Sequence, residues 1–321
     1  MNKDLSPPHV QLAIMSRQYV VSRCIQALAH LGVADHMSLN YPVDIIQLAH
    51  ITNTIPELLD RVLTFLCDYD LFNKSPEGYM LTELSLPLKK DAPHSIKEVL
   101  GMVDDPWWQA FTHLETQLIN GLSGFKQQHG SEFHHFLNDN PEHKMHYEKG
   151  MIQLSAYDDQ AVAKSFACDR FNTLCDIGYG RENLVQVLAT LYPQTTSQTC
   201  LLNVEDAKKP LFTTLPQADA YFLKGILHDF NDGMVEKILH DLLPHMHKDS
   251  LLFIAEQVIA ADDIPHTNKT MDIIMMVLVG GKQRTLRGWQ TIAEQAGFKL
   301  MQTYPIPGVF TVMEFAVKQT N

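Results

Sequence analysis

The sequence predicts an α/β protein in which a mostly helical N-terminal part precedes a doubly wound sheet. From Asn172 onward, short apolar runs alternate with amphipathic helical patterns, as in parallel strands joined by helices. Before Asn172 the apolar residues recur at helical spacing instead. The chain has 321 residues, 45% of them hydrophobic, which is enough for two domains with a sizeable core.

Residues 1–100 are expected to form a small domain of helices and one hairpin. Helices are predicted over 12–31, 43–50 and 56–71, and turn residues within 72–82 separate two short strands. Three helices followed by a hairpin make a winged-helix-like arrangement. The first helix has more apolar surface than so small a unit can bury, which predicts a homodimer through the N-terminal helices; the residues concerned are Leu12, Ile14, Tyr19 and Val20.

Residues 101–170 read as a helical region, with two segments at 107–124 and 132–166. Their large side chains are candidates for the walls of a pocket for a flat ligand, although for any one of them packing is the more common explanation. The candidate pocket residues are Trp108, Phe111, His113, Met151, Tyr157 and Phe166, together with Met275 from the later domain.

Residues 171–321 are expected to form the sheet domain. Strands are predicted at 173–177, 198–204, 218–223, 251–258, 298–303 and 310–317, with a helix at 183–191. Ligands of such folds bind beyond the carboxyl ends of the strands, beside the first glycine turn. That turn is Gly178-Tyr179-Gly180.

Composition excludes several classes of function. A net charge of −12 leaves no basic face for nucleic acid or an anionic membrane. No run of 18 apolar residues exists to span a membrane, and the N-terminus lacks the apolar segment of a signal peptide, so a cytoplasmic location is expected. The five cysteines have no metal-ligand spacing, so no metal site is predicted.

The stretch 220–239 joins a predicted buried strand to a polar turn. The strand ends on Lys224, and the turn His228-Asp229-Phe230 follows. A His–Asp pair at the carboxyl end of a strand is placed where α/β enzymes carry catalytic groups, and His is suited to proton transfer near neutral pH. Alone, the pair is more often explained as a helix cap with an incidental His.

Several motifs occur in a characteristic order: LGVADHM, SAYDDQAVAKSFACDRF, TLCDIGYG, ADAYFLKGILHDFNDGMVEKIL, GGKQRT and TVMEFAVK. In this order and spacing the sequence resembles the plant and bacterial small-molecule O-methyltransferases, over essentially its full length. The resemblance implies a winged-helix-like dimerisation domain followed by a Rossmann-like methyltransferase domain.

The resemblance also implies roles for the residues of the His–Asp turn. His228 would be the general base that deprotonates a substrate hydroxyl while its oxygen attacks the methyl of S-adenosylmethionine. Glu256 would orient the base, with Asp229 beside it. Gln283 stands where the family has a second acid; it can hydrogen-bond, but it cannot stabilise an imidazolium by charge.

For the cofactor, the resemblance implies contacts from Asp176, Gly178, Gly180 and Lys224. The loop departs from the family pattern at Tyr179 and after Gly180. No acid for the ribose hydroxyls is evident, and Glu205 or Asp206 is the candidate substitute. Residues 193–218 are roughly twenty residues shorter than a usual strand–helix–strand crossover requires.

Three functions remain open from the sequence. The first is S-adenosylmethionine-dependent O-methylation of a small aromatic or polyketide-like compound. The second is cofactor-independent acid–base chemistry on a similar substrate by a relative that keeps the fold. The third is a non-catalytic, dimeric binding protein.

Overall fold

The computed structural model describes residues 7–179, 183–204, 211–212, 215–260 and 266–318, except the side chain of Tyr157. The chain divides into two compact units, one formed by Met1–Asp104 with Asn140–Leu154 and the other by Asp105–Asp139 with Ser155–Asn321. The long helix α10 (Pro141–Lys164) belongs to both.

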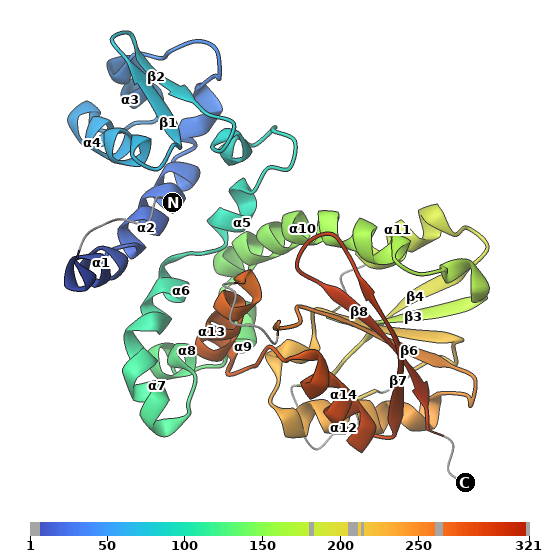
Figure 1. Ribbon diagram of the computed structural model, residues 1–321. Helices are drawn as coiled ribbons and strands as arrows, with labels where there is room; N and C mark the ends of the chain where they lie inside the picture. The colour runs from blue at the N-terminus through green and yellow to red at the C-terminus, as the bar shows by residue number, and fades with distance from the viewer. Residues whose placement is uncertain (1–6, 180–182, 205–210, 213–214, 261–265, 319–321) are drawn as a thin grey trace. The chain divides into compact units, whose positions relative to one another are not determined.

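The first unit contains short helices and one hairpin (Figure 1). Its elements are α1 (Pro8–Met15), α2 (Tyr19–His30), η1 (Val33–His36), α3 (Ile45–Ile51), α4 (Pro56–Cys67), β1 (Phe72–Ser75), β2 (Gly78–Leu81), η2 (Leu86–Leu88), α5 (Lys97–Gly101) and the first part of α10. Leu48, Leu63, Leu66 and Phe72 are buried in one apolar core beneath the hairpin.

Two helix predictions in this unit need correction. The helix predicted over 12–31 is two helices, because Arg17 and Gln18 donate backbone hydrogen bonds three residues back and form a turn. The helix predicted over 56–71 ends at Cys67, since Asp70 takes a left-handed conformation (φ 57°) before the hairpin begins.

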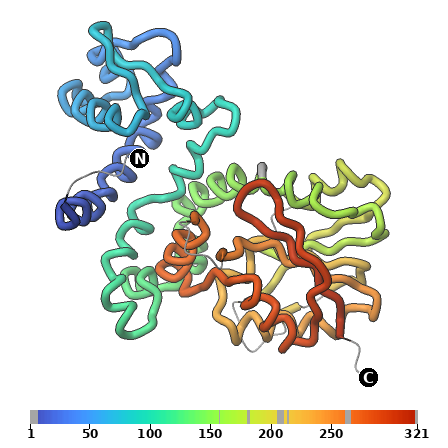
Figure 2. The backbone as a smooth tube through the Cα atoms, viewed as in Figure 1, coloured from blue at the N-terminus to red at the C-terminus, as the bar shows by residue number. Residues whose placement is uncertain are grey.

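The second unit is built on a six-stranded sheet with the order β4-β3-β5-β6-β8-β7. Its strands are β3 (Thr173–Gly178), β4 (Thr196–Leu201), β5 (Ala220–Lys224), β6 (Leu251–Glu256), β7 (Phe298–Pro305) and β8 (Thr311–Val317). The first four in chain order pair in parallel, and β8 pairs antiparallel with β6 and β7. The β7–β8 hairpin ends the chain, as the red tube in Figure 2 shows.

Helices of the second unit precede and separate these strands. They are α6 (Asp105–Ala110), η3 (Phe111–His113), α7 (Leu114–Asn120), α8 (Gly124–His129), α9 (Phe133–Asp139), the last part of α10, η4 (Cys168–Arg170), α11 (Asn183–Leu191), η5 (Leu227–Asp229), α12 (Asp232–Leu242), η6 (Leu243–His245), α13 (Thr267–Val279) and α14 (Leu286–Gln295). The helical segments predicted at 107–124 and 132–166 are therefore each divided.

Alternate residues of the central strands enter two apolar layers, as the two-residue period of a strand requires. Tyr221 and Leu223 pack on one face with side chains of α12 and α14. Phe222 packs on the other face, where its ring stacks 5.0 Å from that of Phe253. Both faces are covered, so the polar groups at the carboxyl ends of the strands are left as the place for a site.

The segment between β4 and β5 has no helix or strand among its described residues. These residues lie between Leu201 and Ala220, and β4 lies at the sheet edge.

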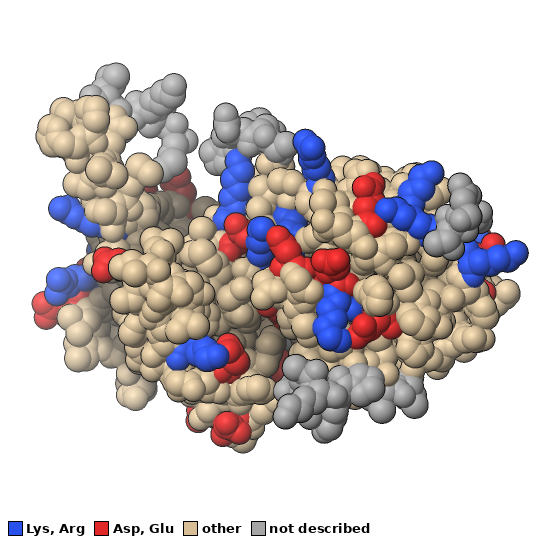
Figure 3. Space-filling view, turned by 90° about the horizontal axis from the view of Figure 1, so that it is seen from below, with Lys and Arg blue, Asp and Glu red and all other residues tan. Residues whose placement is uncertain are grey.

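The surface has no large single-sign patch on the face drawn in Figure 3. There, Lys and Arg side chains are scattered among acidic and uncharged ones. Among the described residues, no helix is both long and apolar enough to cross a membrane.

Candidate active site

The turn after β5 places His228 at the carboxyl edge of the sheet. Gly225 begins this turn with φ of +58°, a conformation that side-chain-bearing residues rarely adopt, and its N–H donates to the carbonyl of Ala255 at 3.0 Å. The short helix η5 follows at once. A Cβ at Gly225 would lie 3.7 Å from Cε1 of His228, so the turn holds the imidazole close to the strand end.

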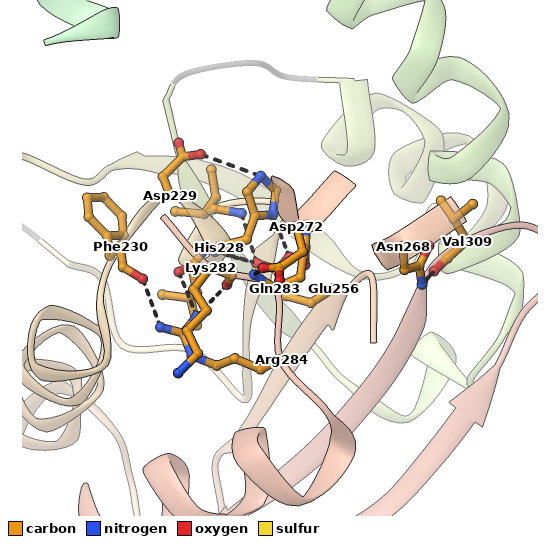
Figure 4. A network of polar contacts seen from close by, with 12 residues as sticks. His228, Asp229, Phe230, Glu256, Asn268, Asp272, Lys282, Gln283, Arg284 and Val309 are labelled. Atoms are coloured by element: carbon orange, nitrogen blue, oxygen red, sulfur yellow. Dashed lines mark hydrogen bonds and ion pairs between the residues drawn. The ribbon is translucent and has the colours of Figure 1, made fainter. Parts of the chain in front are cut away.

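Glu256, at the end of the neighbouring strand β6, holds this turn. Its Oε1 accepts the backbone N–H groups of Ile226 (3.1 Å) and Leu227 (2.8 Å), while Oε2 lies 2.6 Å from Nδ1 of His228 (Figure 4). Glu256 is fully buried. An ionised carboxylate only accepts, so Nδ1 carries the shared proton and Nε2 is left as the nitrogen that can exchange one.

Asp229 faces the other ring nitrogen. Its Oδ1 lies 3.5 Å from Nε2 of His228, and its Oδ2 lies 3.1 Å from both the hydroxyl of Tyr179 and Nε2 of His134. Burial raises the pKa of Asp229, but the hydrogen bond from His134 and the charge of His228 outweigh burial, so the pKa falls below its ordinary value. His228 therefore lies between two carboxylates, as Figure 4 shows.

The two carboxylates control the charge of the imidazole. Burial lowers the pKa of His228, but the negative charge and hydrogen bond of Glu256, helped by Asp229, raise the pKa from 6.5 to about 9. The site therefore stabilises the protonated form of the imidazole relative to a free histidine.

The GGKQRT motif makes hydrogen bonds to the same turn. The N–H of Lys282 donates to the carbonyl of His228 at 2.8 Å. A Cβ on Gly281 would lie 2.1 Å from that carbonyl oxygen, so only glycine allows this approach. The buried guanidinium of Arg284 donates to the carbonyl of Phe230 at 2.8 Å and pairs with Asp232 at 2.8 Å.

Gln283 does not contact the base through its amide. Its backbone N–H donates to Oδ1 of Asp272 at 2.7 Å, and its side chain is 1% exposed. Within the described part of the chain neither side-chain amide atom has a hydrogen-bond partner. The hydrogen bond to the base expected for this residue is thus not formed in the protein without ligand.

A second polar group lies at the carboxyl ends of β3 and β5. Lys224 Nζ lies 2.9 Å from Oδ1 of Asp159 on α10 and 5.0 Å from the ring centre of Phe310. Asp176, on β3, is buried, and burial together with the charge of Asp159 raises its pKa from 3.8 to about 7. A buried group whose pKa is strongly shifted by desolvation and a charged neighbour is a candidate for a functional site.

Comparison with known proteins decides the family. Residues 111–299 match the model of an O-methyltransferase domain, and residues 14–90 match that of an O-methyltransferase dimerisation domain. The chain belongs to the O-methyltransferase family.

Relatives from plants and bacteria align along most of this family member. Scoulerine-9-O-methyltransferase 3 from Papaver somniferum is 27% identical over 314 residues, covering 92% of this chain and 93% of that one. Phenazine O-methyltransferase PhzM from Lysobacter antibioticus is 24% identical over 316 residues, covering 92% of each. Human N-acetylserotonin methyltransferase, solved with S-adenosylmethionine, superposes with a TM-score of 0.86 at 19% identity over 99% of this chain and 100% of that one, which shows a shared fold.

Only part of the cofactor loop expected in an O-methyltransferase lies within the described residues. Gly178 ends β3, where its carbonyl accepts the N–H of Leu202 at 3.0 Å. Gly180 and the candidate ribose ligands Glu205 and Asp206 lie outside the described residues.

The predicted pocket residues come from several elements of both units. Trp108 and Phe111 are half-buried, His113 pairs with Gln128 (2.7 Å), and Met275 lies on α13, which packs against α6, α8 and the η5 turn. Met151 belongs to the first unit, and the Tyr157 side chain lies outside the described residues. Phe166 is corrected to a core residue: it is 5% exposed and stacks 4.6 Å from Phe253, so its ring is not free to line a pocket.

Sequence reasoning missed three residues of the site. Asp159 lies inside a motif quoted for the family resemblance, and its neighbour in sequence, Asp158, made a paired acid visible there. The sequence marks Tyr179 as a departure from the family loop, but it does not predict the contact with Asp229. No pattern in the sequence marks His134, because its contact with Asp229 joins residues 95 positions apart.

Proposed function

We propose that the protein transfers a methyl group from S-adenosylmethionine to a hydroxyl of a small aromatic or polyketide-like compound, with His228 as the general base. The observation that carries the proposal is the contact of His228 Nδ1 with buried Glu256, which leaves Nε2 as the proton-accepting atom. Family membership and relatives named for scoulerine and phenazine support the substrate class.

The residues on β3 and β5 fit such a cofactor. The site is rich in carboxylates, it lies where α/β folds bind ligands, and it holds a buried carboxylate oxygen of Asp159 that no described group satisfies. Asp176, Gly178 and Lys224 would hold the cofactor there. Bound S-adenosylmethionine supplies a methyl group already activated by its sulfonium.

The protein's own part in the reaction is alignment and proton transfer. His228 Nε2 removes the hydroxyl proton of the substrate, and Glu256 stabilises the imidazolium that results. Asp229 faces the same nitrogen and is itself held by Tyr179 and His134, so the ring has two fixed partners. The proton therefore leaves the substrate for a group whose charged form the site already favours.

We infer that the protein acts as a homodimer through its N-terminal helices. Leu12, Met15 and Tyr19 of α1 and α2 are 68%, 68% and 63% exposed, and this segment overlaps the match to the dimerisation domain. Light scattering after size exclusion tests the dimer. Mass for two chains is expected for the wild type, and Leu12→Glu with Tyr19→Glu should yield one; a monomeric wild type would overturn the inference.

The function is tested with methyl-labelled S-adenosylmethionine and a panel of phenols, naphthols and hydroxylated polyketides. Label is expected in at least one product with the wild type. Calorimetry with S-adenosylmethionine accompanies the panel, and the absence of any binding would overturn cofactor use. Conversion of a panel compound in buffer without the cofactor would instead favour cofactor-independent acid–base chemistry.

A further inference from the structure

Asp159 and Lys224 form a buried ion pair beside Asp176. Their side chains are 3% and 10% exposed, and the Asp159 carboxylate reaches Lys224 from α10 with one oxygen, Oδ1, at 2.9 Å. The preceding residue, Asp158, is 6% exposed on the same helix. Asp158, Asp159 and Asp176 are thus three buried carboxyl groups, of which Asp159 pairs with Lys224 and the other two feel its charge.

Among the described residues, the buried acids of this cluster exceed the positive charge of Lys224. Burial, opposed only in part by Lys224, raises the pKa of Asp158 above its ordinary value, and burial with the charge of Asp159 raises that of Asp176 to about 7. A raised carboxyl pKa means that nearby positive charge is insufficient for all the groups to ionise at no cost. One further cation would relieve this shortage.

An independent observation shows where that cation would bind. Asp159 Oδ2 is fully buried and, among the described residues, has no hydrogen-bond partner. A carboxylate oxygen left unpaired in a buried position is costly, and native structures rarely retain one without a reason. The oxygen is therefore a preformed acceptor for a donor that the described part of the chain does not supply.

We propose that Asp159 binds the primary ammonium group of the ligand at this edge of the sheet, which under the proposed function is the methionyl end of S-adenosylmethionine. An ammonium supplies both the missing positive charge and a donor for Oδ2. A ribose hydroxyl would donate but leave the charge unbalanced. A metal ion would need more ligands, and the described residues bring together no group of three or more His, Cys, Asp or Glu that could hold one.

The proposal predicts that Asp159 distinguishes two related compounds. S-adenosylhomocysteine carries the amino-acid end, whereas 5′-methylthioadenosine has the same nucleoside and sulfur without it. By calorimetry, Asp159→Asn should weaken S-adenosylhomocysteine binding about 10- to 100-fold, the range for a hydrogen bond to a charged group, and leave 5′-methylthioadenosine unchanged. Equal loss for both compounds, or no loss for either, would overturn the proposal.

Asp158→Asn is the matched control, because it removes one buried negative charge from the adjacent position of the same helix. It should weaken S-adenosylhomocysteine binding much less than Asp159→Asn does. Equal weakening would show that the total charge matters and that Asp159 makes no direct contact. Thermal unfolding of each ligand-free variant confirms that the comparison is made on folded protein.

A second measurement uses only the wild type and so does not depend on the variants folding. The decarboxylated analogue of S-adenosylhomocysteine keeps the amine, and the deaminated analogue keeps the carboxylate. The amine should bind more tightly than the acid, and the reverse order would contradict the proposal. The inference rests on the proposed function, but the two fail differently: a wild type that binds none of these nucleosides removes both, whereas equal binding by wild type and Asp159→Asn removes only the inference.

Discussion

The two ends of the site differ in how their charges are matched. At His228, the ring lies between Glu256 and Asp229, and each carboxylate has further partners within the chain. At Asp159, an ion pair to Lys224 leaves one carboxylate oxygen unpaired and a surplus of buried acid. The carboxylates beside His228 are paired within the protein, whereas we propose that the free oxygen of Asp159 is paired by a ligand.

The difference follows from what each end must do. A base needs a fixed ring and a set proton affinity before the substrate arrives, so its partners belong to the protein. A binding group needs an unmet interaction, because a fully satisfied group gains little from a ligand. The carboxylates of Glu256 and Asp229 are hydrogen-bonded within the chain, whereas Asp159 keeps one oxygen without a partner among the described residues.

The largest expected effect comes from removing the base. His228→Ala should lower methyl transfer by about 10²- to 10⁴-fold while leaving cofactor affinity nearly unchanged, since the ring acts at the other end of the site. Labelled-methyl transfer and calorimetry measure the two quantities. His240→Ala is the control: this side chain is 73% exposed on α12, and its removal should change neither. Full transfer by His228→Ala would refute the assignment of the base.

Next, Glu256→Gln should lower the pKa of His228 from about 9 toward its ordinary 6.5, because the main source of positive-charge stabilisation is lost. NMR titration of labelled histidines measures this, with His228→Ala identifying the signal. The folded pKa lies above the unfolded one, so the wild-type ring contributes stability that is complete below pH 6.5 and lost as the pH rises through about 9. An unchanged titration in Glu256→Gln would mean that Glu256 does not set the charge of the ring.

A smaller, structural effect is expected at the turn that supports the base. In Gly281→Ala the new Cβ would meet the His228 carbonyl, so the variant should lose about 1–3 kcal/mol of unfolding free energy and some transfer activity. Chemical denaturation gives the stability. Gly101→Ala serves as the control, since nothing lies within 4 Å of a Cβ there, and it should be neutral or slightly stabilising.

The last prediction concerns the pH dependence of stability at the other end of the site. Asp176 has a folded pKa of about 7, above its ordinary 3.8, so the folded state holds its proton more tightly and stability falls as the pH rises through this window. Asp176→Asn should therefore flatten the dependence of the unfolding midpoint on pH between those values. The same slope in wild type and variant would show that the buried acid carries no such cost.

The sequence predicts the architecture better than it predicts the site. Strand positions follow from apolar runs such as 220–224, and the His–Asp turn follows from its place after that strand. The ends of the helices are predicted less accurately than the strands. A turn such as that at Arg17 depends on local backbone dihedral angles, which the spacing of apolar residues does not encode.

Contacts across the chain account for what the sequence could not show. The pairing of Lys224 with Asp159, and of Asp229 with His134, joins side chains from separate helices and strands, and no spacing rule reports such distances. For Phe166 the prediction is wrong in the other direction. The sequence assigns this aromatic residue to a pocket, whereas its ring packs against the rings of Phe222 and Phe253 on the sheet.

A crystal structure of the protein with S-adenosylhomocysteine tests the comparison most directly. The account predicts the amino group of the ligand within hydrogen-bond distance of Asp159 Oδ2, with His228 still between Glu256 and Asp229. An ammonium group bound elsewhere, with that oxygen still unpaired, would contradict it.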